Sequence, residues 1–201
     1  MTWPADPAQQ EERLFAILSG ERFLHMQGLG NEVPFFIYPY DPRLALEVDA
    51  ARKRIVNRLS SRGLRVREID LYDLAVDLLK ARGDWDEVLQ VEPEMEKADF
   101  AEMLRSMLEP EEQLAPAIRS RLAAGPDFDL VLLTGIGEVF PYIRTHNVLN
   151  NLQSIVTDRP LVAFFPGQYA SSASLGSTLV LFGLLKDDQF YRAKDIRDQE
   201  P

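Results

Sequence analysis

The sequence predicts an α/β fold: an open, mostly parallel sheet of about five strands, with helices on both faces and an inserted acidic helical segment. Two short apolar runs, 130–133 and 161–165, each end in a glycine or proline turn, and an amphipathic segment of helical length lies between them. Buried parallel strands are apolar throughout rather than alternating. The stretch 128–169 therefore predicts a strand, a helix and a second strand that together complete the sheet.

Composition narrows the class of protein. At 201 residues the chain is long enough for a single α/β domain spanning 1–201. Its net charge of −10 disfavours a dominant nucleic-acid surface, and the lack of cysteine excludes disulfides and thiolate chemistry. The N-terminus, MTWPADPAQQEER, lacks the basic region and apolar core of an export signal, and no apolar run reaches membrane-span length. We therefore expect a cytoplasmic protein.

The first 32 residues predict a helix and a loop ahead of the sheet. Apolar residues recur at helical spacing from Glu11 to His25, with a break at Ser19 and Gly20. A short helix and a second helical turn are therefore expected, acting as a lid on the core. The glycines and proline of MQGLGNEVP then mark a loop.

The aromatic run PFFIY at 34–38 predicts the first strand, which we expect to end at Pro39 because proline cannot continue a ladder. A helix is predicted from Arg43 to Arg62, with Gly63 as its left-handed C-cap. Its basic residues either complement the helix dipole, which is the favoured interpretation, or form a phosphate-contacting patch. They are Arg52, Lys53, Arg54, Arg58 and Arg62.

The alternating run LRVREIDL at 64–71 predicts an edge strand, and a short helix follows over 72–82. The segment 84–125 is acidic and helical, and its prolines divide it into two or three helices that form an enlarged crossover. An acidic run of this kind is a solvated face or, less commonly, a docking surface.

The last quarter of the chain predicts three further segments. The small residues ASSASLGS at 170–177 predict a flexible loop, and TLVLFGLL at 178–185 predicts a last strand that pairs with the preceding one. The remaining residues, 186–201, are expected to form a C-terminal tail.

A ligand site is predicted where the parallel strands end, because ligands of open α/β sheets bind outside the carboxyl ends of the strands. The alternative is structural: the two glycines make a tight turn, and the glutamate sits favourably in a first helical turn. The candidate ligand-binding residues are Asp41, Thr134, Gly135, Gly137 and Glu138.

The sequence does not match the motifs of nucleotide binding, zinc binding or nucleophilic catalysis. No glycine is followed by lysine, as a Walker A loop requires, and Phe140 replaces the third glycine of a dinucleotide fingerprint. Two histidines without cysteine make a zinc site improbable, and no serine lies in a nucleophile elbow. The sequence therefore predicts no catalytic residues, no metal and no cofactor.

A polar group of side chains interrupts the otherwise apolar helical pattern after residue 140. Such side chains usually bond to nearby backbone, and the alternative is that they present donors to a ligand or partner. The candidate partner-binding residues are Arg144, His146, Asn147, Asn150 and Asn151.

Four strings of residues carry a family resemblance that covers most of the chain: PFFIYPYDPR, TGIGEVFPYIRTHNVLNNLQ, RPLVAFFPGQY and LFGLLKDDQFYRA. Together they resemble the small BrxB-type component of BREX bacteriophage-exclusion systems. The segment 170–177 departs from the compact turn expected there.

The resemblance implies a cytoplasmic part of an antiviral operon that also encodes an AAA-type ATPase, an adenine-specific DNA methyltransferase and an alkaline-phosphatase-like protein. It supplies no catalytic residues to carry over. The favoured hypothesis is a noncatalytic adaptor that docks these larger subunits and supports host-DNA methylation and phage restriction. Two alternatives stay open. One is a degenerate nucleotide-binding domain that uses Asp41, Thr134 and Glu138. The other is a nucleic-acid-binding module that uses Arg52, Lys53, Arg54 and Arg58 with Arg144.

Overall fold

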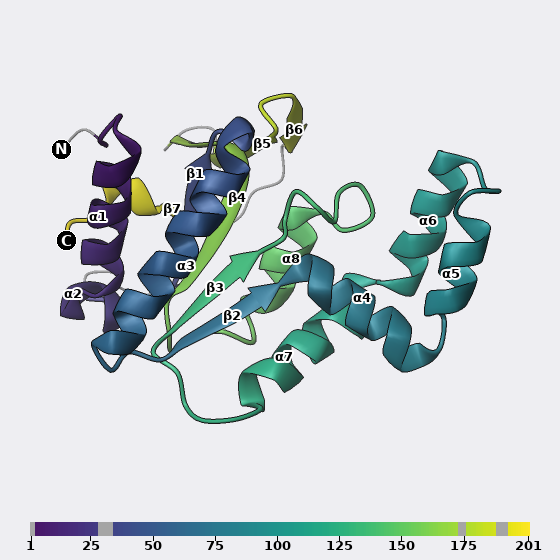
Figure 1. Cartoon of the computed structure of the whole chain (residues 1–201), viewed down its shortest axis with the longest axis horizontal. Coiled ribbons are helices and arrows are strands. Elements are labelled where there is room, and N and C mark those ends of the chain that lie inside the picture. Colours follow the sequence, from purple (N-terminus) through teal and green to yellow (C-terminus); the bar gives the residue numbers. More distant parts are fainter. Residues whose placement is uncertain (1–2, 28–33, 173–175, 188–192) are drawn as a thin grey trace.

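A computed structural model describes residues 3–27, 34–172, 176–187 and 193–201. Five parallel strands form the main sheet in the order β2-β3-β4-β1-β7 (Figure 1). Two further strands, β5 and β6, form an antiparallel extension on the second half of β4. The α/β class and the mostly parallel sheet are thus confirmed. The strands are β1 (Phe35–Tyr40), β2 (Val66–Asp70), β3 (Leu130–Thr134), β4 (Leu161–Ser172), β5 (Gly176–Leu181), β6 (Leu185–Asp187) and β7 (Lys194–Asp195).

Two helices end at the glycines where the sequence predicted a helix end. Gly63 and Gly83 end these helices in the left-handed conformation, with φ of 83° at each, as a glycine C-cap does. The α-helices are α1 (Pro7–Leu18), α2 (Glu21–Leu24), α3 (Ala45–Ser61), α4 (Leu71–Arg82), α5 (Trp85–Val91), α6 (Lys97–Met107), α7 (Ala115–Ala123) and α8 (Thr145–Leu152). Shorter turns are η1 (Pro42–Leu44), η2 (Pro110–Leu114, a π-helical turn) and η3 (Ile196–Asp198).

Two apolar cores lie on opposite faces of the sheet, because successive strand residues point to opposite faces. On one face, Phe36, Leu132 and Phe164 pack with residues of α1 and α3. On the other face, Ile37 and Leu133 pack with residues of α4 to α8. The central strands are therefore apolar throughout 130–133 and 161–165, which explains why these sequences do not alternate.

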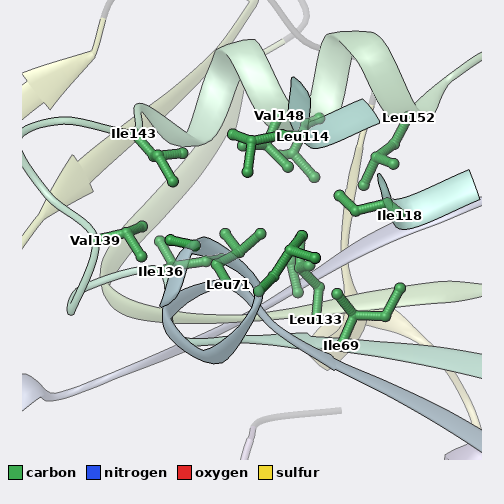
Figure 2. Close-up of a cluster of buried hydrophobic side chains, with 14 of the residues drawn as sticks. Ile69, Leu71, Leu114, Ile118, Leu133, Ile136, Val139, Ile143, Val148 and Leu152 are labelled. Atoms are coloured by element: carbon green, nitrogen blue, oxygen red, sulfur yellow. The ribbon is translucent and has the colours of Figure 1, made fainter. Parts of the chain in front are cut away.

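The core that contains Ile37 and Leu133 also includes side chains from the acidic segment 84–125, which pack this segment against the sheet. Figure 2 shows Leu114 and Ile118, from η2 and α7, beside Val148 and Leu152 of α8. All four side chains are almost fully buried. The end of the 84–125 segment is therefore part of the core, whereas α5 and α6 lie at the end of the molecule away from both termini (Figure 1).

Two expected boundaries are wrong. The first strand continues through Pro39, which lies opposite Phe165, instead of ending there. Since β7 pairs with β1 only at Phe36 and Ile37, one side of β1 is open at Pro39, and an open edge tolerates the missing N–H. The helix after β3 begins only at Thr145. The turns before it contain a proline, which disfavours helix at and before its position.

The expected loop at 170–177 is mostly strand, because β4 extends to Ser172 and β5 begins at Gly176. Its central residues, 173–175, lie outside the described residues. The last strand ends at Leu181 rather than residue 185, since a turn intervenes before β6. The expected tail contains β7 and η3, and Ile196 is fully buried. Residues 188–192 of that tail and 28–33 of the N-terminal loop also lie outside the described residues.

Among the helices that the structure describes, none has the length and apolar character needed to cross a bilayer.

Candidate functional site at the strand ends

The carboxyl ends of β2 and β3 are joined by hydrogen bonds between the side chains that follow them. Asp70 Oδ2 accepts a hydrogen bond of 2.8 Å from the Thr134 hydroxyl. Asp70 Oδ1 accepts from the backbone N–H groups of Tyr72 and Asp73, at 2.9 and 3.1 Å, and so caps α4. Thr134, a predicted ligand residue, therefore already has a partner inside the protein.

The glycine turn after β3 packs closely against this cap. Gly135 has φ +74°, and a Cβ atom there would lie 2.7 Å from Asp70 Oδ1 and 2.9 Å from the backbone nitrogen of Leu71. A Cβ atom on Gly137 would lie 2.8 Å from Cγ of Pro166. These distances favour the structural alternative for both glycines, and their role in ligand binding stays a prediction.

Glu138 lies in an acidic environment. Burial raises the pKa of its carboxyl group, and the negative charges of Asp70, Asp49 and Asp73 raise it further. The pKa of Tyr40 is raised to about 12, first by burial and then by Glu138. Added negative charge, such as a phosphate, is therefore disfavoured beside Glu138. Within the described residues, no three side chains of the metal-binding types are grouped to hold a metal ion.

Asp41, the remaining predicted ligand residue, is engaged by its neighbour Arg43. Its carboxylate accepts hydrogen bonds from the Arg43 backbone N–H at 3.0 Å and from Nη2 at 2.5 Å. These bonds lower the pKa of Asp41 to about 2. The structure therefore places Asp41 in an ion pair, while Thr134 and Gly135 meet at Asp70.

The same arrangement recurs at the end of the adjacent strand β7. Asp195 accepts from the backbone N–H of Arg197 at 2.9 Å and from its Nη2 at 2.5 Å. Sequence reasoning missed this pair of turns. The available signal was the repetition of Asp-Pro-Arg after β1 as Asp-Ile-Arg after β7.

Both turns border a cleft of about 460 Å³ at the carboxyl end of β1 and beside Gly167 and Gln168 in the middle of β4. Each arginine that lines the cleft is neutralised by the aspartate two residues before it. The cleft therefore offers guanidinium N–H groups without a surplus of positive charge. Its lining residues are Pro39, Tyr40, Asp41, Pro42, Arg43, Gly167, Gln168, Phe182, Gly183 and Arg197.

The predicted partner-binding residues divide between surface and core. Arg144, Asn147 and Asn150 are exposed, whereas His146 is buried and Asn151 is half-buried. The Asn151 side chain donates to the Asn147 carbonyl at 2.9 Å, the local bonding usual for asparagine. Arg144 lines a groove of about 250 Å³ that leads to the β5–β6 turn. Partner binding by these five residues stays a prediction.

The basic residues of α3 are engaged by carboxylates. Arg54 and Arg58 lie 2.7 and 2.6 Å from carboxylates of α1, and Lys53 lies 2.7 Å from Asp49. Arg52 pairs with Asp49 and with Glu68 of β2. A phosphate would have to displace these carboxylates. Arg54 and Arg58 therefore hold α1 against α3, and all four cations are poorly placed to form a nucleic-acid-binding patch.

Comparison with known proteins supplies the family. The family model described as "BREX protein BrxB" matches residues 67–196, which is more than half of the chain. The chain belongs to the BrxB family. A BrxB protein of Bacillus cereus (strain H3081.97) is 36% identical over 199 residues, covering 94% of this chain and 97% of that protein.

A second BrxB protein, from Escherichia coli O9:H4 (strain HS), is 28% identical over 153 residues and covers 76% of this chain and 75% of that protein. No solved structure matches the chain. Membership of the BrxB family confirms the resemblance drawn from the sequence and makes the chain a BREX component.

Proposed function

We propose that this BrxB-family chain is a noncatalytic adaptor that docks larger BREX subunits in the cytoplasm, and so supports host-DNA methylation and phage restriction. The candidate partners are the AAA-type ATPase, the phosphatase-like protein and the DNA methyltransferase. Membership of a multi-component system supports partners of this kind.

One contrast on the protein surface carries the proposal. At the strand ends, polar side chains bind one another, as in the Asp70–Thr134 and Asp41–Arg43 pairs. Elsewhere, large apolar side chains lie exposed at separate places on the molecule: Leu46 is 84% exposed, Leu184 83% and Leu89 48%. Leu184 lies in the β5–β6 turn next to Leu185 and near Phe182, which are 42% and 37% exposed, and a grouped set of exposed apolar side chains suits contact with another protein.

The two alternative functions have less support from the geometry. A nucleotide at the strand ends would bring phosphates beside Glu138, whose pKa is already raised by burial and by neighbouring carboxylates. Nucleic acid would have to displace carboxylates from the cations of α3. The adaptor function requires neither change.

The test is affinity purification of the tagged chain from cells that carry its complete BREX gene set. We expect at least one larger BREX subunit to co-elute in fixed ratio at moderate salt. Elution of the chain alone, with every other subunit expressed, would contradict the adaptor function.

A further inference from the structure

The helices α4, α5 and α6 enclose an apolar groove that adjoins the turns after β3, because the hydroxyl of its lining residue Tyr142 donates to the Glu138 carbonyl at 3.2 Å. The groove has a volume of about 200 Å³. Figure 1 shows α5 and α6 at the end of the molecule, so the groove lies far from both termini. Its lining residues are Tyr72, Ala75, Val76, Leu79, Trp85, Val88, Leu89, Glu92, Phe100, Leu104, Leu108 and Tyr142.

Two of these lining residues are more exposed than the fold requires. Val88 and Leu104 are buried and attach α5 and α6 to the core. Leu89, adjacent to Val88, is 48% exposed, and Tyr72 of α4 is 42% exposed. Leu89 and Tyr72 therefore present apolar surface at the mouth of the groove that the fold leaves uncovered.

The surroundings of the groove are strongly acidic. Residues 84–125 contain eleven acidic and four basic residues, so this segment has a net charge of −7 in a chain of net charge −10. Asp86 and Glu92 lie three residues before and after Leu89, on the same helical face. Within the part of the chain that the structure describes, neither carboxylate forms an ion pair, unlike Asp84, which pairs with Arg82 at 2.8 Å.

The half-buried phenol of Tyr142 lies beside these negative charges. Burial raises the pKa of Tyr142, and Tyr72, Glu138 and Glu92 raise it further. The groove thus combines an apolar lining with a net negative surround: Glu92 lines the groove, and Lys80 lies over the Trp85 ring at 5.3 Å from its centroid. A complementary ligand is apolar at its centre and positively charged at its edges.

We propose that this groove docks a basic segment of another BREX subunit, one that inserts a large apolar side chain flanked by lysine or arginine. The inference rests on the proposed adaptor function and specifies the chemistry of the partner. Charge complementarity favours a basic protein segment, and the same negative charge repels the phosphates of nucleic acid.

Two groove variants test the inference by co-purification with the complete BREX gene set. Leu89→Asp places a charge at the groove mouth, and the double variant Asp86→Lys/Glu92→Lys reverses the negative charges beside it. Both change exposed side chains, and thermal unfolding of each purified variant checks that it is folded. We expect each variant to reduce recovery of the partner subunit about tenfold or more, as central interface substitutions do.

Matched controls lie on α3, across the sheet from the groove. Asn57→Asp places a charge at an exposed polar position, and Glu47→Lys reverses an exposed carboxylate. We expect both controls to recover the partner within about twofold of the unmodified chain. Recovery by the unmodified chain should also fall as salt is raised, since salt screens exposed charge.

A photo-crosslinker at position 89 identifies the docked segment. The expected adduct joins position 89 to a BREX subunit segment with net positive charge and a large apolar residue. The inference is overturned if the groove variants recover the partner as the unmodified chain does, if the controls lose it equally, or if position 89 crosslinks to an acidic segment. If the unmodified chain recovers no BREX subunit, the proposed adaptor function fails as well.

Discussion

Asp70 has more structural roles than any other residue at the strand ends. Its two carboxylate oxygens cap α4 and bind the Thr134 hydroxyl, so one side chain joins β2, β3 and a helix. The motif DLYDL shows the cap in the sequence, because aspartate before an apolar helical pattern is a start signal. The Thr134 partner, 64 residues away, could not be predicted from local sequence.

Replacing Asp70 tests this assignment. We expect Asp70→Ala to lower the free energy of unfolding by about 1–3 kcal/mol, because it removes a helix cap and leaves the Thr134 hydroxyl without its partner. Urea denaturation measures the change. Asp73→Ala is a suitable control, because that side chain is exposed and lacks those bonds. Equal stability of the Asp70 variant and the unmodified chain would contradict the assignment.

Glu138 predicts a pH dependence with a definite sign. Its pKa is raised in the folded protein above 4.5, so the folded state binds the proton more tightly than the unfolded chain. Ionisation of Glu138 therefore reduces stability as pH rises through its folded pKa, whereas both states are protonated well below pH 4.5.

We accordingly expect Glu138→Gln to be more stable than the unmodified chain at pH 7. The gain is at most about 1 kcal/mol, because the carboxyl group is partly solvated and its charge interactions are screened. Denaturation at pH 7 and pH 4 measures it, with Glu47→Gln as an exposed control. A stability gain of equal size at both pH values, or a loss of stability at pH 7, would contradict this prediction. Either result would mean that burial of the Glu138 charge does not cause the change in unfolding free energy.

At the scale of elements, the acidic segment has two parts with different roles. Leu114 and Ile118 are buried against α8 (Figure 2). Leu89 of α5 lies exposed at the groove mouth. The prolines and the acidic composition predicted helices in this segment. Both parts are acidic and helical, so these signals do not distinguish one part from the other. Sequence alone could not show which of them completes the core, since that depends on contacts with α8.

Alanine substitutions distinguish the two parts. We expect Ile118→Ala to cost about 2–5 kcal/mol of unfolding free energy, because it empties a space in the core, and Leu89→Ala to cost about 0.5 kcal/mol or less. Chemical denaturation measures both. Similar losses for the two variants would mean that Leu89 contributes to the core as Ile118 does.

At the scale of the whole molecule, the hydrophobic pattern and the positions of glycine and proline were sufficient to predict the fold class and most helices and strands. The errors occurred where pairing partners override local signals. Pro39 stays in a strand because the neighbouring edge is open, and residues 170–172 pair as strand with residues 176–178. The candidate site was predicted less fully, because the Asp41–Arg43 and Asp195–Arg197 turns meet only once β1 and β7 are adjacent.

The adaptor function is also a property of the whole molecule, and the most direct test of it is whether larger BREX subunits depend on this chain to associate. The tagged AAA-type ATPase is purified from cells with the complete gene set, from cells lacking this gene, and from cells in which the gene is restored. We predict that the phosphatase-like protein or the methyltransferase co-elutes with the ATPase, is lost without this chain, and returns on restoration. Unchanged association of the larger subunits in its absence would contradict the adaptor function.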